Sequence, residues 1–138
     1  MDEASIRGSC LCGSISFEIT PPFQLMMHCH CNRCRKSTGT GHATNIAIDP
    51  SQFRWTSGEE LIQRYDLTTA KSFSKWFCSR CGCPVPRMRR GGPFMIVPAG
   101  SLDSNPPMKP TDHIFWGSRA PWSCESGGLP THAELPVA

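Results

Sequence analysis

Apolar and polar residues alternate over several short segments of the chain, and no segment sustains a 3.6-residue periodicity. In Ser14 to Ile19 ("SISFEI"), Ile15, Phe17 and Ile19 occupy every second position and share one face, as expected for a half-buried strand. Short apolar or alternating segments also predict strands at 43–49 ("ATNIAID"), 60–67 ("ELIQRYDL"), 72–77 ("SFSKWF") and 93–97 ("PFMIV"). One helical turn is predicted around Asn32 to Ser37. The pattern therefore indicates an all-β protein with few or no long helices.

The composition agrees with a small fold that is rich in turns. The 138 residues include 13 prolines and 12 glycines, and only 38% are hydrophobic. This size and composition predict one domain, residues 1–138, whose apolar core is thin. The segment from Asn105 onward is rich in proline and glycine, and we expect it to run irregularly over the surface.

The cysteine content changes this picture, because nine cysteines are many for a chain of this length. The N-terminus lacks the basic and apolar regions of a signal peptide, and no apolar run approaches the ~20 residues of a membrane span. We therefore expect a cytoplasmic protein with no membrane partner. In that reducing compartment, clustered and odd-numbered cysteines indicate metal ligands more than disulfides.

Two pairs of cysteines have the spacing of a closed structural metal site. Cys78 and Cys81 form a C-x-x-C turn, and Gly82 relieves the backbone beside it. Cys10 and Cys12 are two residues apart, so an extended chain directs both side chains to one face. Together they predict a four-thiolate structural zinc site, here named the four-cysteine cluster. The alternative is a set of buried free thiols.

A second group, Cys29, Cys31 and Cys34, is here named the thiol triplet. Cys29 and Cys31 share a face, His28 and His30 point the other way, and Cys34 follows on the next turn. Three protein ligands with one open position are typical of a catalytic zinc site. The sequence therefore predicts a second, catalytic and more labile zinc ion.

Other arrangements of the thiol triplet remain open at this stage. The triplet could form a disulfide, or a closed structural site whose fourth ligand is Cys83, His28 or His30. The roles of these three residues and of the isolated Cys124 are not defined by the sequence.

Basic and aromatic residues near the thiol triplet are candidates for substrate binding. Arg33, Arg35 and Lys36 could lower thiol pKa values and attract anions, or form a solvated turn. Trp116 and Trp122 could form a pocket wall or belong to the core. The "RMRR" run at 87–90 is interpreted as a solvated turn. The formal charge of +3 would fall to zero with seven thiolates and two zinc ions, so we expect no nucleic-acid partner.

The segments "GSCLCG", "HCHCNRCRKSTG", "FCSRCG", "AGSLD" and "WGSRAPW" together resemble the glutathione-dependent formaldehyde-activating enzyme family, also called centromere protein V-like. They run from Gly8 to Trp122 and cover most of the chain. One departure is Cys83, which stands where the family more often has Thr or Ser.

The resemblance implies a β-tent-like zinc fold of short antiparallel strands. It also implies a structural zinc ion at the four-cysteine cluster and a catalytic one at the thiol triplet. The implied activity is that of a carbon–sulfur lyase acting on a glutathione or related thiol adduct, as in S-(hydroxymethyl)glutathione synthase. The alternatives are a non-catalytic zinc scaffold or interaction module, and a zinc-thiolate redox sensor. The expected partner is a small thiol such as glutathione.

Overall fold

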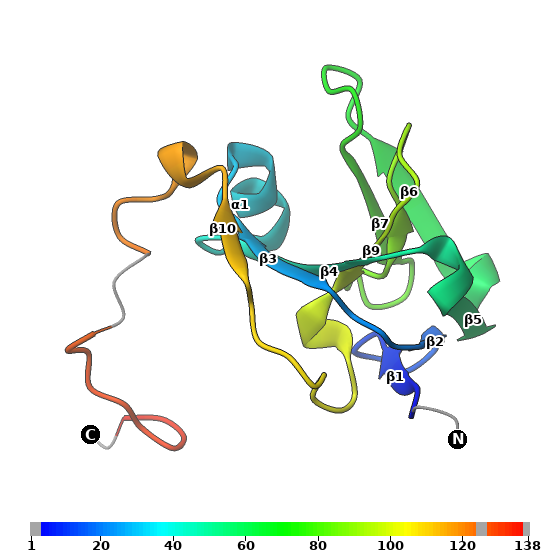
Figure 1. Ribbon diagram of the computed structural model, residues 1–138, viewed down its shortest axis with the longest axis horizontal. Coiled ribbons are helices and arrows are strands. Elements are labelled where there is room, and N and C mark those ends of the chain that lie inside the picture. Colours follow the sequence, from blue (N-terminus) through cyan, green and yellow to red (C-terminus); the bar gives the residue numbers. More distant parts are fainter. Residues whose placement is uncertain (1–3, 124–126, 137–138) are drawn as a thin grey trace.

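The computed structural model describes residues 4–123 and 127–136, and its regular elements are mainly short strands, with one α-helix beside β3 (Leu25–Cys29) and β10 (Asp112–Ile114) (Figure 1). Cys124, whose role the sequence left open, lies outside the described residues. Apart from one parallel pair, the strands pair antiparallel. The predicted all-β class is therefore confirmed.

The first sheet has the order β1-β2-β5. Its strands are β1 (Ile6–Ser9), β2 (Ser16–Ile19) and β5 (Phe53–Ser57). Ile15, Phe17 and Ile19 are all fully buried, which confirms the face predicted from their alternation. Gly8 lies opposite Phe17, and a Cβ atom on Gly8 would come within 2.1 Å of the Phe17 ring. Only glycine allows this close approach of strand and ring.

The second sheet has the order β10-β3-β4-β9-β8 and contains the longest strand. Its members are β3 (Leu25–Cys29), β4 (Ala43–Ile48), β8 (Arg87–Met88), β9 (Met95–Pro98) and β10 (Asp112–Ile114). The strands predicted at 43–49 and 93–97 are confirmed. Helix α1 (Asn32–Thr38) follows β3, where a helical turn was expected, and Gly39 ends it with a left-handed backbone conformation.

The segment from Asn105 onward was predicted to run irregularly over the surface, but part of it forms a strand. Asp112–Ile114 forms β10, which pairs parallel with β3 at the edge of the second sheet (Figure 1). This strand is too short to give a periodic pattern, and its pairing partner is more than eighty residues earlier in the chain. Both features hide it from single-sequence reasoning.

A third sheet consists of β6 (Ile62–Asp66) and β7 (Ser74–Cys78), which confirms the strands predicted in those regions. Short 3₁₀ helices complete the described elements: η1 (Pro50–Gln52), η2 (Glu59–Leu61), η3 (Ala99–Ser101) and η4 (Trp116–Ser118). No helix in the described part of the chain is both long and apolar enough to span a membrane.

The largest apolar core lies between the first and second sheets. Phe17, Ile46 and Val97 are fully buried there and come from three different strands. Two smaller clusters contain cysteines: one surrounds Cys10 and Cys78, and the other surrounds Cys29 and Cys34. These cysteines therefore belong to small apolar clusters outside the largest core.

Candidate metal centres and their cavity

The four-cysteine cluster forms where the turn after β1 meets the end of β7. The ligand atoms of Cys10, Cys12, Cys78 and Cys81 all lie within 4.8 Å of one another. The Sγ atom of Cys12 is 3.6 Å from that of Cys10 and 3.8 Å from that of Cys78. Zinc–sulfur bonds of about 2.3 Å in a tetrahedron separate two sulfur atoms by about 3.8 Å, whereas a disulfide separates them by about 2.05 Å. The cluster therefore fits a metal ion.

Backbone amides around this cluster point at its sulfur atoms. The N–H groups of Ile15 and Arg80 donate to the sulfur atoms of Cys10 and Cys78, at 3.4 and 3.3 Å. Backbone donors lower the pKa of Cys81 to about 6, and burial raises that of Cys10. Gly82 has the positive φ of 75° that the tight turn after Cys81 requires. The local backbone thus favours thiolates.

The thiol triplet occupies the junction between β3 and α1. Cys29 is the last residue of β3, Cys31 is the N-cap of α1 and Cys34 lies in its first turn. Their sulfur atoms also lie within 4.8 Å of one another. The backbone N–H of Cys34 donates to the sulfur of Cys31 at 3.3 Å. A strand that ends as a helix begins therefore brings all three side chains to one point.

The pKa values of Cys29 and Cys34 in the thiol triplet are shifted in opposite directions. Hydrogen bonding from Cys34 lowers the pKa of Cys29 to about 6. The hydrogen bond to Cys29, together with burial, raises the pKa of Cys34. Within the free triplet, Cys29 is therefore favoured over Cys34 as the thiolate.

No fourth cysteine, histidine or carboxylate joins the thiol triplet among the residues that the structure describes. His28 and His30 extend to the other face of β3, and Cys83 packs with Cys81 and the core around Cys10. The three candidates that could have closed this site are thus directed elsewhere. The arrangement can hold a metal ion with a position left for an external ligand.

A cavity of about 320 Å³ opens beside the thiol triplet. All three cysteines line it, and so do Arg33 and Arg87. Its apolar wall includes Phe73, Phe94, Ile96, Ile114 and Phe115. A pocket of this size, with apolar walls and a few polar groups, is typical of a small-molecule site.

Arg87 is the main cavity residue that the sequence interpretation missed. Its guanidinium lies 5.5 Å from the centre of the Phe73 ring, and the side chain is half-buried. Burial lowers the pKa of Arg87, and nearby thiolates of the triplet oppose that shift. The interpretation of 87–90 as a solvated turn is therefore wrong for Arg87. The signal was available, because alternation along a strand directs residues 87 and 89 to one side, and both line the cavity.

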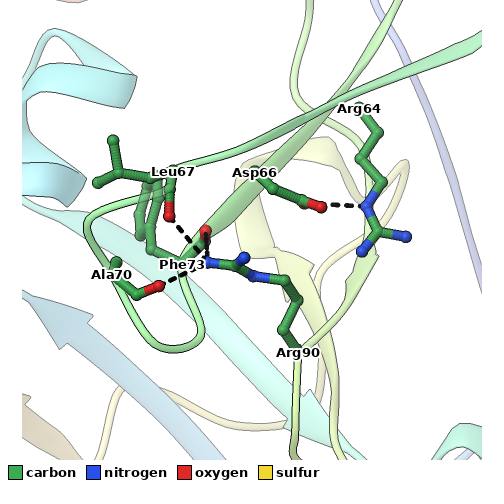
Figure 2. A network of polar contacts seen from close by, with 6 residues as sticks. All are labelled: Arg64, Asp66, Leu67, Ala70, Phe73 and Arg90. Carbon is green, nitrogen blue, oxygen red and sulfur yellow. Dashed lines mark hydrogen bonds and ion pairs between the residues drawn. The ribbon is translucent and has the colours of Figure 1, made fainter.

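Arg90, from the same run, fixes the loop that carries one cavity wall. Its Nη2 atom donates to the carbonyl oxygens of Leu67, Ala70 and Phe73 at 3.0, 3.0 and 2.8 Å (Figure 2). Three carbonyl groups that converge on one guanidinium hold the loop between β6 and β7 in a single shape. Arg90 thereby positions Phe73 in the cavity wall.

The other predicted substrate-binding residues lie away from this cavity. Arg35, Lys36 and Trp122 line a shallow depression on another side of α1, and the Trp122 side chain is 69% exposed. Trp116 stacks with Arg119, whose guanidinium is 4.4 Å from the ring centre. Only Arg33 of the predicted cations and tryptophans lines the cavity with the thiol triplet.

A group of histidines lies on the opposite face of β3. The rings of His28 and His42 are 4.2 Å apart between centres, and Nε2 of His30 is 2.8 Å from Nδ1 of His113. Trp116 packs edge-on against His30. Burial lowers the pKa of His28 and of His30, which favours their neutral forms. These contacts fasten β10 to β3 and explain why the histidines do not turn toward the triplet.

Comparison with known proteins agrees with this geometry. A crystal structure of a Rhodobacter sphaeroides protein matches with a TM-score of 0.62 and 25% identity, covering 78% of this chain and 98% of that chain. No match was found among curated proteins. The sequence profile described as "Glutathione-dependent formaldehyde-activating enzyme" matches residues 5–118. Because that match spans most of the chain and includes both cysteine groups, the protein belongs to the glutathione-dependent formaldehyde-activating enzyme family.

Proposed function

We propose that this protein is a zinc-dependent enzyme of the carbon–sulfur lyase type that acts on an adduct of glutathione or a related thiol. The observation that carries the proposal is the thiol triplet, whose three ligands face a cavity of about 320 Å³. The family description names glutathione and formaldehyde. The four-cysteine cluster would hold the structural zinc ion, and Cys29, Cys31 and Cys34 would hold the catalytic one.

The donor chemistry supports zinc at both positions. Thiolates favour zinc over magnesium or calcium, which prefer oxygen ligands. A zinc ion held by three thiolates would supply a Lewis-acid position for a thiolate or a carbonyl oxygen. In the reaction itself, the substrate sulfur forms a bond to the formaldehyde carbon as the carbonyl π bond breaks. The thiol proton ends on the new hydroxyl oxygen, and no oxidant is needed.

The chain's own residues bind and orient the reactants. Arg87, held over Phe73 beside the sulfur atoms, balances the negative charge of the thiol triplet. Arg33 lines the same cavity and is available to an anionic substrate. Ile114 and Phe115 contribute apolar surface to one wall of the cavity. Phe115 has a left-handed backbone conformation (φ 54°), which costs about 1–2 kcal/mol and places its ring at the cavity.

The proposed setting is the reducing cytoplasm. Clustered thiols that are not paired in disulfides are typical of a reducing compartment, and the described cysteines form no disulfide. Glutathione, the proposed thiol partner, belongs to the same kind of compartment.

The test is the exchange of ¹³C-labelled formaldehyde between its hydrate and S-(hydroxymethyl)glutathione, followed by NMR. The zinc-loaded protein should accelerate exchange above the spontaneous rate. Cys31→Ser should lose the acceleration, whereas Cys83→Ser, a matched change outside both proposed ligand sets, should retain it. Exchange at the spontaneous rate with the wild-type protein, or full acceleration by Cys31→Ser, would refute the proposal.

A further inference from the structure

A second cavity, of about 220 Å³, adjoins the one beside the thiol triplet. Residues of α1, β4 and β7 line it. The two cavities share the lining residues Cys34, Asn45, Phe73, Arg87 and Ile96. The two cavities therefore lie side by side, and a ligand that extends from one to the other would pass these five residues.

The second cavity contains polar groups that lack partners. Ser74 lines it and is only 1% exposed, yet its hydroxyl makes no hydrogen bond. Trp76 lines it as well, and its buried indole Nε1 has no acceptor. Because more than about 90% of buried polar groups in proteins are satisfied, two orphans at one cavity indicate a missing hydrogen-bond partner. The indole N–H can only donate, so that partner must be an acceptor.

The charged residues that line the second cavity are cations, which suit an anionic acceptor. Lys75 and Arg87 both line it, and no aspartate or glutamate is among the described residues that do. The Lys75 ammonium donates to the carbonyl of Ser37 and forms no ion pair within the described chain, which leaves donors free. Burial, and then the charge of Arg87, lower the pKa of Lys75. An anion between these two cations would relieve their repulsion.

We propose that this second cavity is the subsite for a carboxylate of the thiol substrate, with Lys75 and Ser74 as its principal donors. The inference rests on the proposed function, because it places the substrate's sulfur at the thiol triplet and its carboxylate beyond Cys34 and Arg87. A carboxylate supplies the acceptor that the unpartnered donors lack and the counter-charge for Lys75, which forms no ion pair within the described chain. The cavity thereby selects thiols that carry an acid group over neutral thiols.

The probe for this subsite is γ-glutamyl-2-aminobutyryl-glycine, the glutathione analogue in which a methyl group replaces the thiol. It keeps both carboxylates and cannot offer a sulfur atom to a metal ion. Its diethyl ester removes the carboxylate charges. Titration calorimetry with the zinc-loaded protein should show binding of the acid and weakening by about tenfold or more for the ester, as expected for losing a charged hydrogen bond.

Three variants test which residues bind the carboxylate of the analogue. Lys75→Met should weaken binding of the acid about tenfold and leave binding of the ester unchanged. Ser74→Ala removes only an unpartnered hydroxyl, so it should fold normally and weaken the acid about fivefold. Lys71→Met changes an exposed lysine of the preceding loop and should have no effect.

Absence of binding by the wild-type protein would overturn the inference. So would equal affinity for the acid and its ester, or equal affinity of Ser74→Ala and Lys71→Met for the acid. These results are independent of the formaldehyde exchange assay, because the analogue has no thiol. If the protein binds the analogue through Lys75 but does not accelerate the exchange, the subsite is supported and the proposed function is refuted.

Discussion

The sulfur atoms of Cys12 and Cys78 lie 3.8 Å apart, although 66 residues separate them in the chain. This contact joins the turn after β1 in the first sheet to the end of β7 in the third. Cys78 is fully buried, whereas Cys12 is exposed, so the cluster is anchored in the core on one side only. A metal ion that bridges these thiolates would therefore stabilise the packing of one sheet against another.

Cys78→Ser should prevent stable folding. One lost thiolate weakens a site whose metal-binding energy is part of the folding energy. Circular dichroism on heating and zinc content by mass spectrometry provide the measurements. The matched control is Cys83→Ser, two residues beyond Cys81, which should melt like the wild type. A soluble Cys78→Ser protein with cooperative melting and unchanged zinc would contradict the structural role of the cluster.

Cys31→Ser should behave differently. Cys31 is half-buried at the start of α1, and the strands around it are held by their own pairing. The variant should fold, retain about one zinc ion per chain and lose the formaldehyde exchange activity. Serine can still cap the helix, so little stability should be lost with the sulfur. Global unfolding of this variant would instead indicate that the thiol triplet is a second structural site.

Metal loss should occur in two steps. The thiol triplet faces a cavity and lacks a fourth protein ligand among the described residues, whereas the other cluster has four. Mild peroxide or a weak chelator should therefore remove one zinc ion first and leave the fold intact. Glutathione should slow this step by taking the open position.

Peptide mass mapping identifies which cysteines react in that first step. Cys29, Cys31 and Cys34 should appear oxidised while the four-cysteine cluster remains protected. Simultaneous release of both ions, or earlier oxidation of Cys78, would show that the structural and labile roles are reversed.

Arg90→Ala should destabilise the protein by about 3 kcal/mol, because it leaves three carbonyl groups without their shared donor. The neighbouring Arg64→Ala is the control, since its exposed ion pair with Asp66 contributes only about 0–1 kcal/mol (Figure 2). Urea unfolding compares the two. Loosening of the loop should also weaken substrate binding at Phe73. Equal losses from both variants would contradict the positioning role of Arg90.

The local sequence pattern predicted several strands of the fold. The alternation in 14–19 predicted the buried face of β2, and the apolar runs predicted β4 and β9, because period-2 burial is a property of neighbouring residues. The strands that escaped prediction are β1, β3, β5, β8 and β10, which are two to five residues long and depend on pairing with other segments. Such pairing leaves no mark on the local pattern.

The candidate site divides in the same way. Cysteine spacing by itself determined which neighbouring thiols lie together, since i, i+2 residues share a face and a C-x-x-C turn presents two sulfur atoms to one point. Only the tertiary structure decided which side chains surround them. Arg87 and Phe73 reach the thiol triplet from a strand and a loop at least 39 residues later in the chain. Lys75 reaches the adjoining cavity, whereas Arg35 and Lys36 line a depression on another side of α1. Neighbouring thiols are brought together by short-range backbone geometry, which the local sequence determines. The meeting of Cys10 and Cys12 with Cys78 and Cys81, like the cavity wall, is made by the packing of distant elements, which the local sequence does not determine.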